Sequence, residues 1–117
     1  MAEKPLIDAD ENKLISISGE TEFVPNGIAS RTLLRTPNMR VVLFGFAEGQ
    51  ELSEHASTQH AVVQVLSGEC DFTVSGAVHR MKPGDLLYMK PNAPHALRAV
   101  SKFSMLLTLS KPDFAIK

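Results

Sequence analysis

The stretch "AVVQVLSGECDFTVS" (residues 61–75) has an alternating pattern on each side of a turn signal at Ser67-Gly68. Successive side chains of a β-strand point to opposite faces, so alternate residues share one face. In residues 70–74 the odd and even positions separate apolar from polar side chains, and in residues 61–66 one face is wholly apolar. The pattern predicts two antiparallel strands. The side chains that we expect to face the core are Ala61, Val63, Val65, Cys70, Phe72 and Val74.

Similar short segments follow one another along most of the chain. They are rich in β-branched and aromatic residues, and Gly, Pro and Asn separate them, as tight connections between strands require. No segment has an amphipathic helical period longer than two turns. The predicted strands cover residues 13–18, 30–36, 39–47, 61–66, 70–75, 78–81, 85–89, 95–100 and 103–109. This spacing predicts an all-β sandwich or barrel.

The length of 117 residues suits one domain. With 44% hydrophobic and 21% charged residues, the composition is that of a folded globular protein. We expect residues 1–117 to form a single domain with its core in residues 39–109. The strands predicted within residues 13–36 would complete a sheet or form a dimer edge.

The charge balance argues against two classes of partner. The formal net charge is −1, from 12 basic and 13 acidic residues, which disfavours binding to nucleic acid or to an anionic membrane. The longest apolar run, "VVLFGFA", is too short to span a bilayer, and the polar, acidic start does not have the pattern of a secretory signal.

Cys70 is the only cysteine, which excludes an internal disulfide. We expect a cytoplasmic protein whose Cys70 is a buried apolar residue.

Two segments carry motifs of fixed spacing. Residues 49–68 fit the pattern G-x5-H-x-H-x3-E-x6-G, with Gly49, His55 and Gly68 retained, and residues 84–99 fit G-x5-P-x-G-x2-H-x3-N. In this register they resemble the two conserved motifs of the cupin superfamily of RmlC-like small barrels. The resemblance implies a cupin-type double-stranded β-helix, or jelly-roll, barrel. It also implies a homodimer formed through outer strands.

The match is uneven at the positions of the four family metal ligands. His55 and His95 are retained, whereas Ser57 replaces the second histidine and Ala61 replaces the glutamate. The first metal-binding motif is therefore degenerate. The second motif has Lys90, Asn92 and Ala99 at its proline, glycine and asparagine positions. Asn92 is a tolerable replacement for glycine because asparagine adopts positive φ more readily than most residues.

The resemblance points to one weakly held divalent ion as the cofactor. Neutral imidazoles suit Zn, Ni, Fe or Mn, and catalytic sites usually have three protein ligands. His55, His60 and His95 are the candidate ligands. On a regular strand His60 faces away from Ala61, so it would need a β-bulge or a loose loop in residues 57–60 to turn inward. We expect no organic cofactor.

Three functions stay open at this point, and whether the protein is an enzyme stays open with them. In the first, the barrel binds a small organic molecule through the metal ion. In the second, a metal-free ligand-binding or sensor barrel presents His55 and His95 with the candidate ligand-binding residues Ser57, Gln59 and Tyr88. The third is an isomerase or epimerase with His95 as base and Tyr88 as acid. We expect His79 to face solvent.

Overall fold

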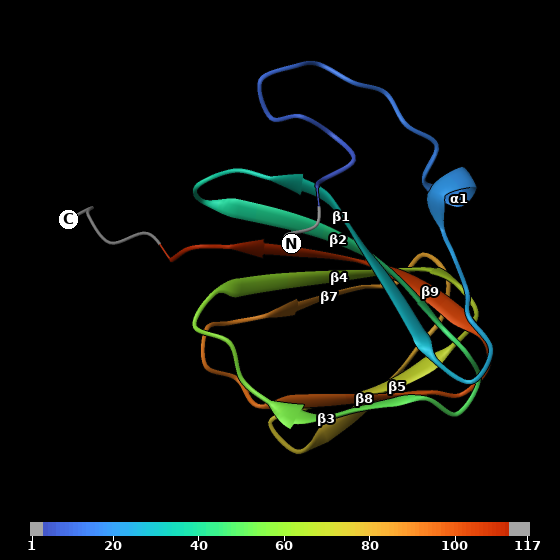
Figure 1. Cartoon of the computed structure of the whole chain (residues 1–117). Coiled ribbons are helices and arrows are strands. Elements are labelled where there is room, and N and C mark those ends of the chain that lie inside the picture. Colours follow the sequence, from blue (N-terminus) through green and yellow to red (C-terminus); the bar gives the residue numbers. More distant parts are fainter. Residues whose placement is uncertain (1–3, 113–117) are drawn as a thin grey trace.

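The computed structural model describes residues 4–112 (Figure 1). Within them the chain forms nine strands and one short helix, which confirms the all-β prediction. The elements are α1 Ile17–Glu20, β1 Ile28–Arg35, β2 Met39–Phe46, β3 Glu51–His55, β4 His60–Ser67, β5 Cys70–Val74, β6 Ala77–Met81, β7 Leu86–Met89, β8 His95–Ala99 and β9 Phe103–Ser110. None of the helices in residues 4–112 is long and apolar enough to cross a membrane.

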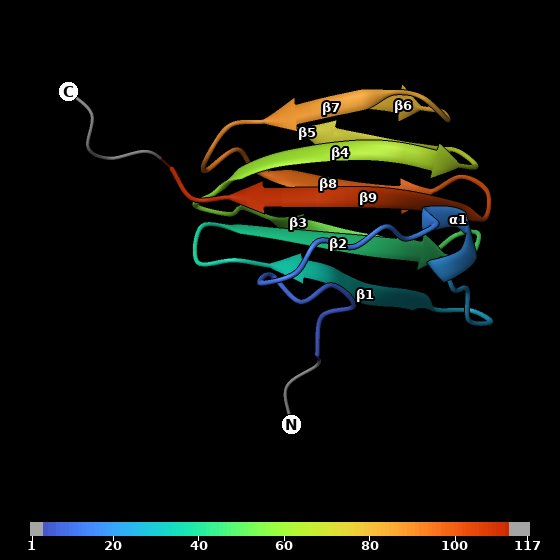
Figure 2. The ribbon, with the colours of Figure 1, turned by 90° about the horizontal axis from the view of Figure 1, so that it is seen from above.

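The strands form two facing antiparallel sheets (Figures 1 and 2). One sheet has five strands in the order β1-β2-β9-β4-β7, and the other has four in the order β3-β8-β5-β6. After β2 each strand crosses to the other sheet, except that β5 and β6 pair as neighbours in the four-stranded sheet, so the chain winds as a jelly roll. This confirms the predicted jelly-roll barrel.

Alternation within the strands builds the core between the sheets. The three side chains predicted to face inward from β4 are at most 3% exposed, and Cys70 and Phe72 of β5 are equally well buried. Val74 is partly buried and packs against the same cluster. Phe46 of β2 stacks on Phe103 of β9, with 4.7 Å between ring centroids. The inward faces inferred from the sequence are therefore confirmed.

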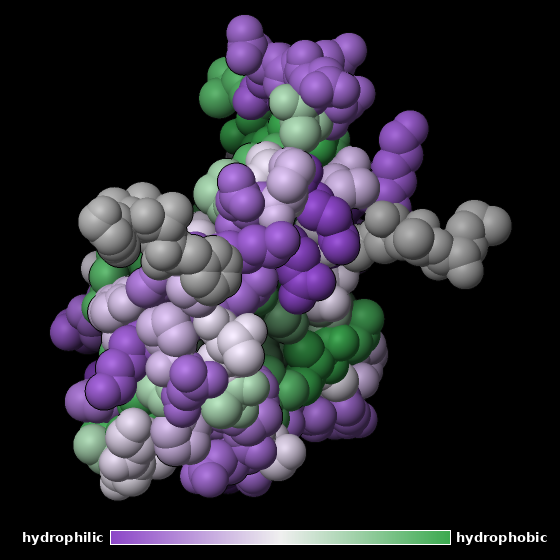
Figure 3. Space-filling view, turned by 90° about the vertical axis from the view of Figure 1, so that its left-hand side faces the viewer, coloured by the Kyte–Doolittle hydropathy of each residue, from purple (hydrophilic) through white to green (hydrophobic). Residues whose placement is uncertain are grey.

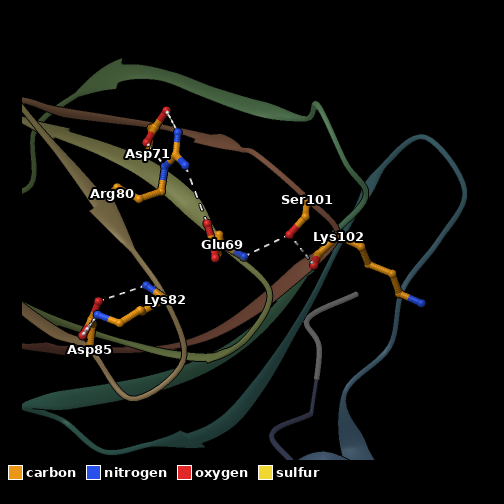
Figure 4. Close-up of polar contacts among 7 residues, drawn as sticks. All are labelled: Glu69, Asp71, Arg80, Lys82, Asp85, Ser101 and Lys102. Atoms are coloured by element: carbon orange, nitrogen blue, oxygen red, sulfur yellow. Dashed lines mark hydrogen bonds and ion pairs between the residues drawn. The ribbon is translucent and has the colours of Figure 1, made fainter.

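At one end of the barrel, residues 67–69 and 100–103 are joined by backbone hydrogen bonds near the fully buried rings of Phe46 and Phe103. This end, which also includes residues 82–85, is called the closed end. Gly68 has a φ of +70°, and a Cβ at this position would collide with the carbonyl oxygen of Lys102 and with Phe103. A side chain is thus excluded by both conformation and space. Nearby, the amide of Glu69 donates to Ser101 Oγ at 3.0 Å (Figure 4).

The predicted strand over residues 13–18 is wrong. Ser16 instead caps α1, with its Oγ accepting a hydrogen bond from the amide of Gly19 at 3.3 Å. Leu14 is 96% exposed, and Ile15 and Ile17 are only partly buried. A strand needs a neighbouring strand, and residues 13–18 have none.

Residues 6 and 7 occupy the place beside β1 that the predicted strand would need. The amide of Leu6 donates to the carbonyl of Thr32 at 3.1 Å, and that of Ile7 donates to Leu33 at 2.7 Å. β1 lies at the edge of the five-stranded sheet, and its outer edge is partly covered by the N-terminal segment. The strand β3 was not among the predicted strands, because its sequence "ELSEH" has a single aliphatic residue.

Candidate ligand-binding site

A cavity of about 300 Å³ lies between the two sheets. It opens at the end formed by residues 35–40, 55–59 and 90–95, which is called the open end. Figure 3 faces this end and shows hydrophobic surface, in green, between hydrophilic side chains, in purple. The lining residues are mostly apolar, with polar groups gathered toward the opening. They are Arg40, Phe44, Leu52, His55, Ser57, Ala61, Phe72, Met89, His95, Ala96, Leu97, Met105, Leu107 and Leu109.

A β-bulge directs His55 toward the cavity. In the pairing of β3 with β8, Leu52 lies opposite Leu97 and His55 lies opposite His95, so three steps on β3 match two on β8. Without the extra residue, alternation from Leu52 would place Glu54 on the inner face. Bulges re-aim side chains in this way at sheet rims. The bulge thus lies in β3, whereas the sequence analysis considered one at residues 57–60.

His55 and His95 lie side by side on the four-stranded sheet. Their ring centroids are 4.3 Å apart, with 62° between the ring planes. Phe72 lies on the other side of His95, with 6.1 Å between centroids. Both histidines line the cavity, as the spacing of the two motifs led us to expect. His55 is exposed and His95 is half-buried, which places the pair at the opening.

Backbone carbonyls hold one nitrogen of each imidazole. His55 Nδ1 lies 2.9 Å from the carbonyl oxygen of Ser53, and His95 Nδ1 lies 3.0 Å from that of Ala93. A carbonyl oxygen only accepts, so each Nδ1 must carry the proton and donate. In the neutral rings Nε2 then has a free lone pair. Both histidines therefore keep one acceptor for a ligand or a metal ion.

His60 lies outside the cavity. The pairing of β4 with β9 is regular from His60 to Val65, so His60 points away from the face on which Ala61 lines the cavity. Its Nδ1 is 2.8 Å from the hydroxyl of Tyr88 on the neighbouring strand β7. The inward turn that His60 would need to act as a ligand does not occur, because no bulge interrupts the first part of β4.

Tyr88 is also on the outer face of the five-stranded sheet and is 52% exposed. Met89, the next residue of β7, lines the cavity, and alternation directs Tyr88 away from it. Tyr88 and His95 therefore do not meet in one site. The acid and base of the isomerase hypothesis are not brought together, since such a pair must reach the same substrate. The expectation that His79 faces solvent is confirmed.

Ser57 and Gln59 lie at the open end. Ser57 lines the cavity, and its Oγ accepts a hydrogen bond from the amide of Gln59 at 3.1 Å. Its carbonyl accepts from the amide of Asn92 at 2.7 Å, which joins the two loops at the opening. Asn92 has a φ of 70°, as expected for a residue at the family's glycine position. Gln59 borders an adjoining polar pocket rather than the cavity itself.

Comparison with known proteins agrees with this architecture. Residues 42–110 match the family model described as "Cupin domain". The chain belongs to the cupin family. A conserved protein of unknown function from Streptococcus pyogenes is 31% identical, covers 97% of both chains and has a TM-score of 0.82. Among curated proteins, no sequence matches the chain significantly.

Two further solved structures are similar to this cupin. A cupin superfamily protein from Desulfitobacterium hafniense is 25% identical, with 96% of this chain and 100% of that chain covered and a TM-score of 0.79. An RmlC-like cupin from Desulfovibrio desulfuricans is 26% identical, with 88% of this chain and 100% of that chain covered and a TM-score of 0.78. The RmlC-like assignment made from the two motifs is thus confirmed.

The described residues of this cupin offer fewer metal-ligating side chains than a resident metal ion usually has. Within residues 4–112 no group of three or more His, Cys, Asp or Glu side chains is placed to hold one. His55 and His95 supply two imidazoles, while Ala61 lines the cavity without any donor atom. Metal sites usually have three or four protein ligands. The expected set of His55, His60 and His95 is not formed.

The sequence analysis missed Arg40. It lies at the start of β2 and alternates with Val42, Phe44 and Phe46, whose side chains face the interior. This places a guanidinium on the inner face of the sheet, where the barrel opens. The sequence does contain a signal for this residue. Arg40 lies at the same alternating positions as three apolar residues of one strand, which predicts that it shares their inner face.

Cys70 takes no part in the site. It is fully buried at the start of β5, and burial raises the pKa of its thiol from 9.0 to about 12. A thiol must lose its proton to act as a nucleophile or metal ligand. Cys70 is therefore a packing residue, as expected from the sequence.

Proposed function

We propose that this cupin binds a small organic molecule in the cavity between its sheets. The apolar part of the molecule lies against the sheet walls, and a polar group of the molecule meets His55 and His95. The observation that carries the proposal is an apolar cavity with two imidazoles at its opening, each fixed through Nδ1.

The dimensions and lining of the cavity support this function. Pockets for small molecules commonly enclose about 300–1,000 Å³ and combine apolar walls with a few oriented polar groups. The cavity of about 300 Å³ is at the lower limit of that range. Phe44, Phe72 and Leu107 are among its apolar walls. A ligand with a compact apolar body fits these surroundings best.

The two histidines supply directional recognition. A neutral imidazole with Nδ1 protonated accepts a hydrogen bond at Nε2, so it recognises a hydroxyl or an amide proton. When protonated, the same nitrogen donates to an oxygen. Because the Ser53 and Ala93 carbonyls orient the rings, little side-chain entropy is lost on binding.

Filling the cavity tests the proposal. Ala61 is 3% exposed and lines the cavity, whereas Gln64 is on the outer face of the same strand. Ala61→Leu adds apolar volume inside, and Gln64→Leu is the matched control outside. A panel of small neutral and acidic molecules is screened by ligand-observed NMR. We expect ligands of the wild type to lose about tenfold or more in affinity in Ala61→Leu, which is about 1.4 kcal/mol, and none in Gln64→Leu. Unchanged affinities in Ala61→Leu would refute the proposal.

A divalent ion held by the histidine pair is the second candidate. It is favoured by the free Nε2 atoms of two adjacent imidazoles, which are ligands for Zn, Ni, Fe or Mn. Because the described residues supply only these two donors, water or a bound ligand would complete the coordination and affinity would be low.

Elemental analysis separates the two candidates. Protein purified without any immobilised-metal column is compared with His55→Ala and with His79→Ala, whose histidine is exposed on β6. Stoichiometric metal in the wild type and His79→Ala, lost in His55→Ala, would favour the ion. Equal, trace content in all three would favour the metal-free barrel.

The homodimer implied by the resemblance stays a proposal. Light scattering at micromolar concentration tests it directly, with a mass of about twice the 12.8 kDa of one chain as the expected result. A mass of one chain would exclude it at that concentration.

A further inference from the structure

We infer that Arg40 recognises a carboxylate on the ligand of the cavity, so that the ligand class is small carboxylic acids with an apolar body. This inference rests on the proposed ligand-binding function and names its substrate class. It is carried by the position of Arg40, by the polar groups around it and by the lack of an acidic partner for it among the residues that the structure describes.

Arg40 lies at the opening of the cavity, between its interior and the solvent. It lies opposite Leu109 of β9, a cavity wall, and borders both the cavity and the polar pocket beside it. Two residues further along β2, Val42 continues the same face and is 4% exposed. A group bound to this guanidinium is therefore placed at the opening, with the rest of the molecule directed toward the apolar interior.

Among the described residues, 4–112, no acidic group compensates the charge of Arg40. In residues 4–112 no carboxylate lies within 4 Å of it, although other arginines are paired: Arg31 with Glu20, Arg80 with Asp71 and Arg98 with Glu51. Arg35 of β1 lies directly opposite Arg40. Like charges placed opposite on neighbouring strands destabilise a sheet. An anion at this point would remove that repulsion.

Arg35 and Arg40 differ in what else they face. Arg35 also borders the N-terminal segment that carries Asp8 and Glu11, outside the barrel. Arg40 borders the cavity. The positive charge of Arg35 adds to the local potential, and Arg40 is the residue placed for direct contact with a ligand inside the barrel.

A carboxylate suits these donors better than other polar groups do. Guanidinium binds carboxylate through two parallel N–H···O bonds, and such charge-assisted bonds are about twice as strong as neutral ones. Ser57 Oγ already accepts from the amide of Gln59, so its own proton is free to donate to an oxygen of the ligand. A single monoanion matches the one guanidinium that faces the cavity.

The test compares acids with their isosteric amides. A panel of aliphatic and aromatic monocarboxylates, each paired with its primary amide, is titrated into the wild type, Arg40→Met, Arg40→Lys and Arg98→Met by isothermal calorimetry or ligand-observed NMR. Arg98→Met removes the same charge from the outer face of the four-stranded sheet, where Arg98 is paired with Glu51. Thermal unfolding checks that each variant is folded.

We expect the acids to bind the wild type and Arg98→Met about tenfold or more tightly than the amides. Arg40→Met should lose this preference while still binding the apolar body, and Arg40→Lys should keep part of it, because lysine lacks the planar fork. A preference that survives in Arg40→Met would overturn the inference, and so would equal binding of acids and amides to the wild type.

Ala61→Leu distinguishes failure of this inference from failure of the proposed function. If acids and amides both bind, lose affinity in Ala61→Leu and are not distinguished, the cavity binds ligands but Arg40 does not select acids. If no member of the panel binds, or if binding is indifferent to Ala61→Leu, the proposed function fails and the inference fails with it.

Discussion

The two ends of the barrel hold their charged side chains in different ways. Near the closed end, Arg80 Nε is 2.6 Å from Asp71 and its guanidinium is 3.6 Å from Glu69, while Lys82 is 3.6 Å from Asp85 (Figure 4). At the open end, the guanidinium of Arg40 has no such partner in residues 4–112, and the two histidines use only Nδ1.

This difference separates structural contacts from groups kept free for binding. Exposed ion pairs add little stability, so the closed end depends mainly on apolar and backbone packing around Phe46, Gly68 and Phe103. At the open end the same sheets enclose a cavity and place hydrogen-bond donors and acceptors around it. Changes at the closed end should therefore affect stability, and changes at the open end should affect binding.

The largest expected effect comes from two phenylalanines on one face of β2. Phe46 is fully buried and stacks on Phe103, whereas Phe44 is half-buried and borders the cavity. Phe46→Ala should lower the free energy of unfolding by about 3–5 kcal/mol, as removal of a large core side chain does. Phe44→Ala should cost less because its ring already faces open space. Urea unfolding measures the loss of stability in each variant. Equal losses would contradict the claim that the two ends differ in how much they contribute to stability.

Gly68 tests the backbone of the closed end. Gly68→Ala forces a Cβ against the carbonyl of Lys102 at positive φ, whereas Gly76→Ala has the same strained φ, +87°, with no atom within 4 Å of the added Cβ. The first variant should therefore be less stable than the second by about 1–3 kcal/mol, the usual cost of overpacking. Chemical denaturation gives the difference. Equal stabilities would show that the contact with Lys102 is relieved by a small shift.

Alkaline pH tests whether the closed end excludes water. The folded state holds the Cys70 proton up to a pKa of about 12, above the 9.0 of an unperturbed thiol, because the side chain is buried. The unfolded state loses this proton first, so stability should fall as pH rises between about 9 and 12, by at most about 1.4 kcal/mol per pH unit from this group. Cys70→Ala should show a shallower fall in the same denaturation series. Parallel curves for the two proteins would indicate that water reaches the thiol.

The smallest effect is expected at the ion pair of Asp71 with Arg80. The hydrogen bond from Arg80 lowers the pKa of the Asp71 carboxyl below 3.8. The folded state thus binds the proton less readily than the unfolded state. The stabilisation is present above pH 3.8 and is lost as pH falls through the lowered pKa. Asp71→Asn should be slightly less stable than the wild type at pH 7, and the two should converge in acid. A stability difference between the two proteins that grows as pH falls would contradict the predicted direction of the pH dependence.

The fold was largely predictable because period-two patterns persist in most strands. Residues 61–66 and 70–74 have apolar inner faces, and the turn between them contains the glycine that the closed end requires. The segment 13–18 has a similar composition, yet it forms no strand. Its sequence does not show that residues 6 and 7 already occupy the edge of β1. Whether residues 13–18 form a strand depends on which residues pair with β1, and that is not visible in the local sequence.

The site was only partly predictable for the same reason. Motif spacing located His55 and His95, but the bulge that turns His55 inward depends on how β3 pairs with β8. The orientation of His60 was left conditional on a bulge, because a bulge cannot be located from one strand alone. Arg40 was missed because its pairing with Leu109, which places it at the cavity wall, is a property of the assembled sheet.

One NMR titration tests the central claim that the open end is the ligand site. Side-chain nitrogen signals of ¹⁵N-labelled protein are followed while the tightest-binding monocarboxylate is added. We predict that the Nε2 signals of His55 and His95 and the guanidinium signals of Arg40 shift together and saturate, while those of His79 and Arg80 stay in place. Saturable shifts confined to His79 or Arg80, with His55, His95 and Arg40 unaffected, would contradict the account.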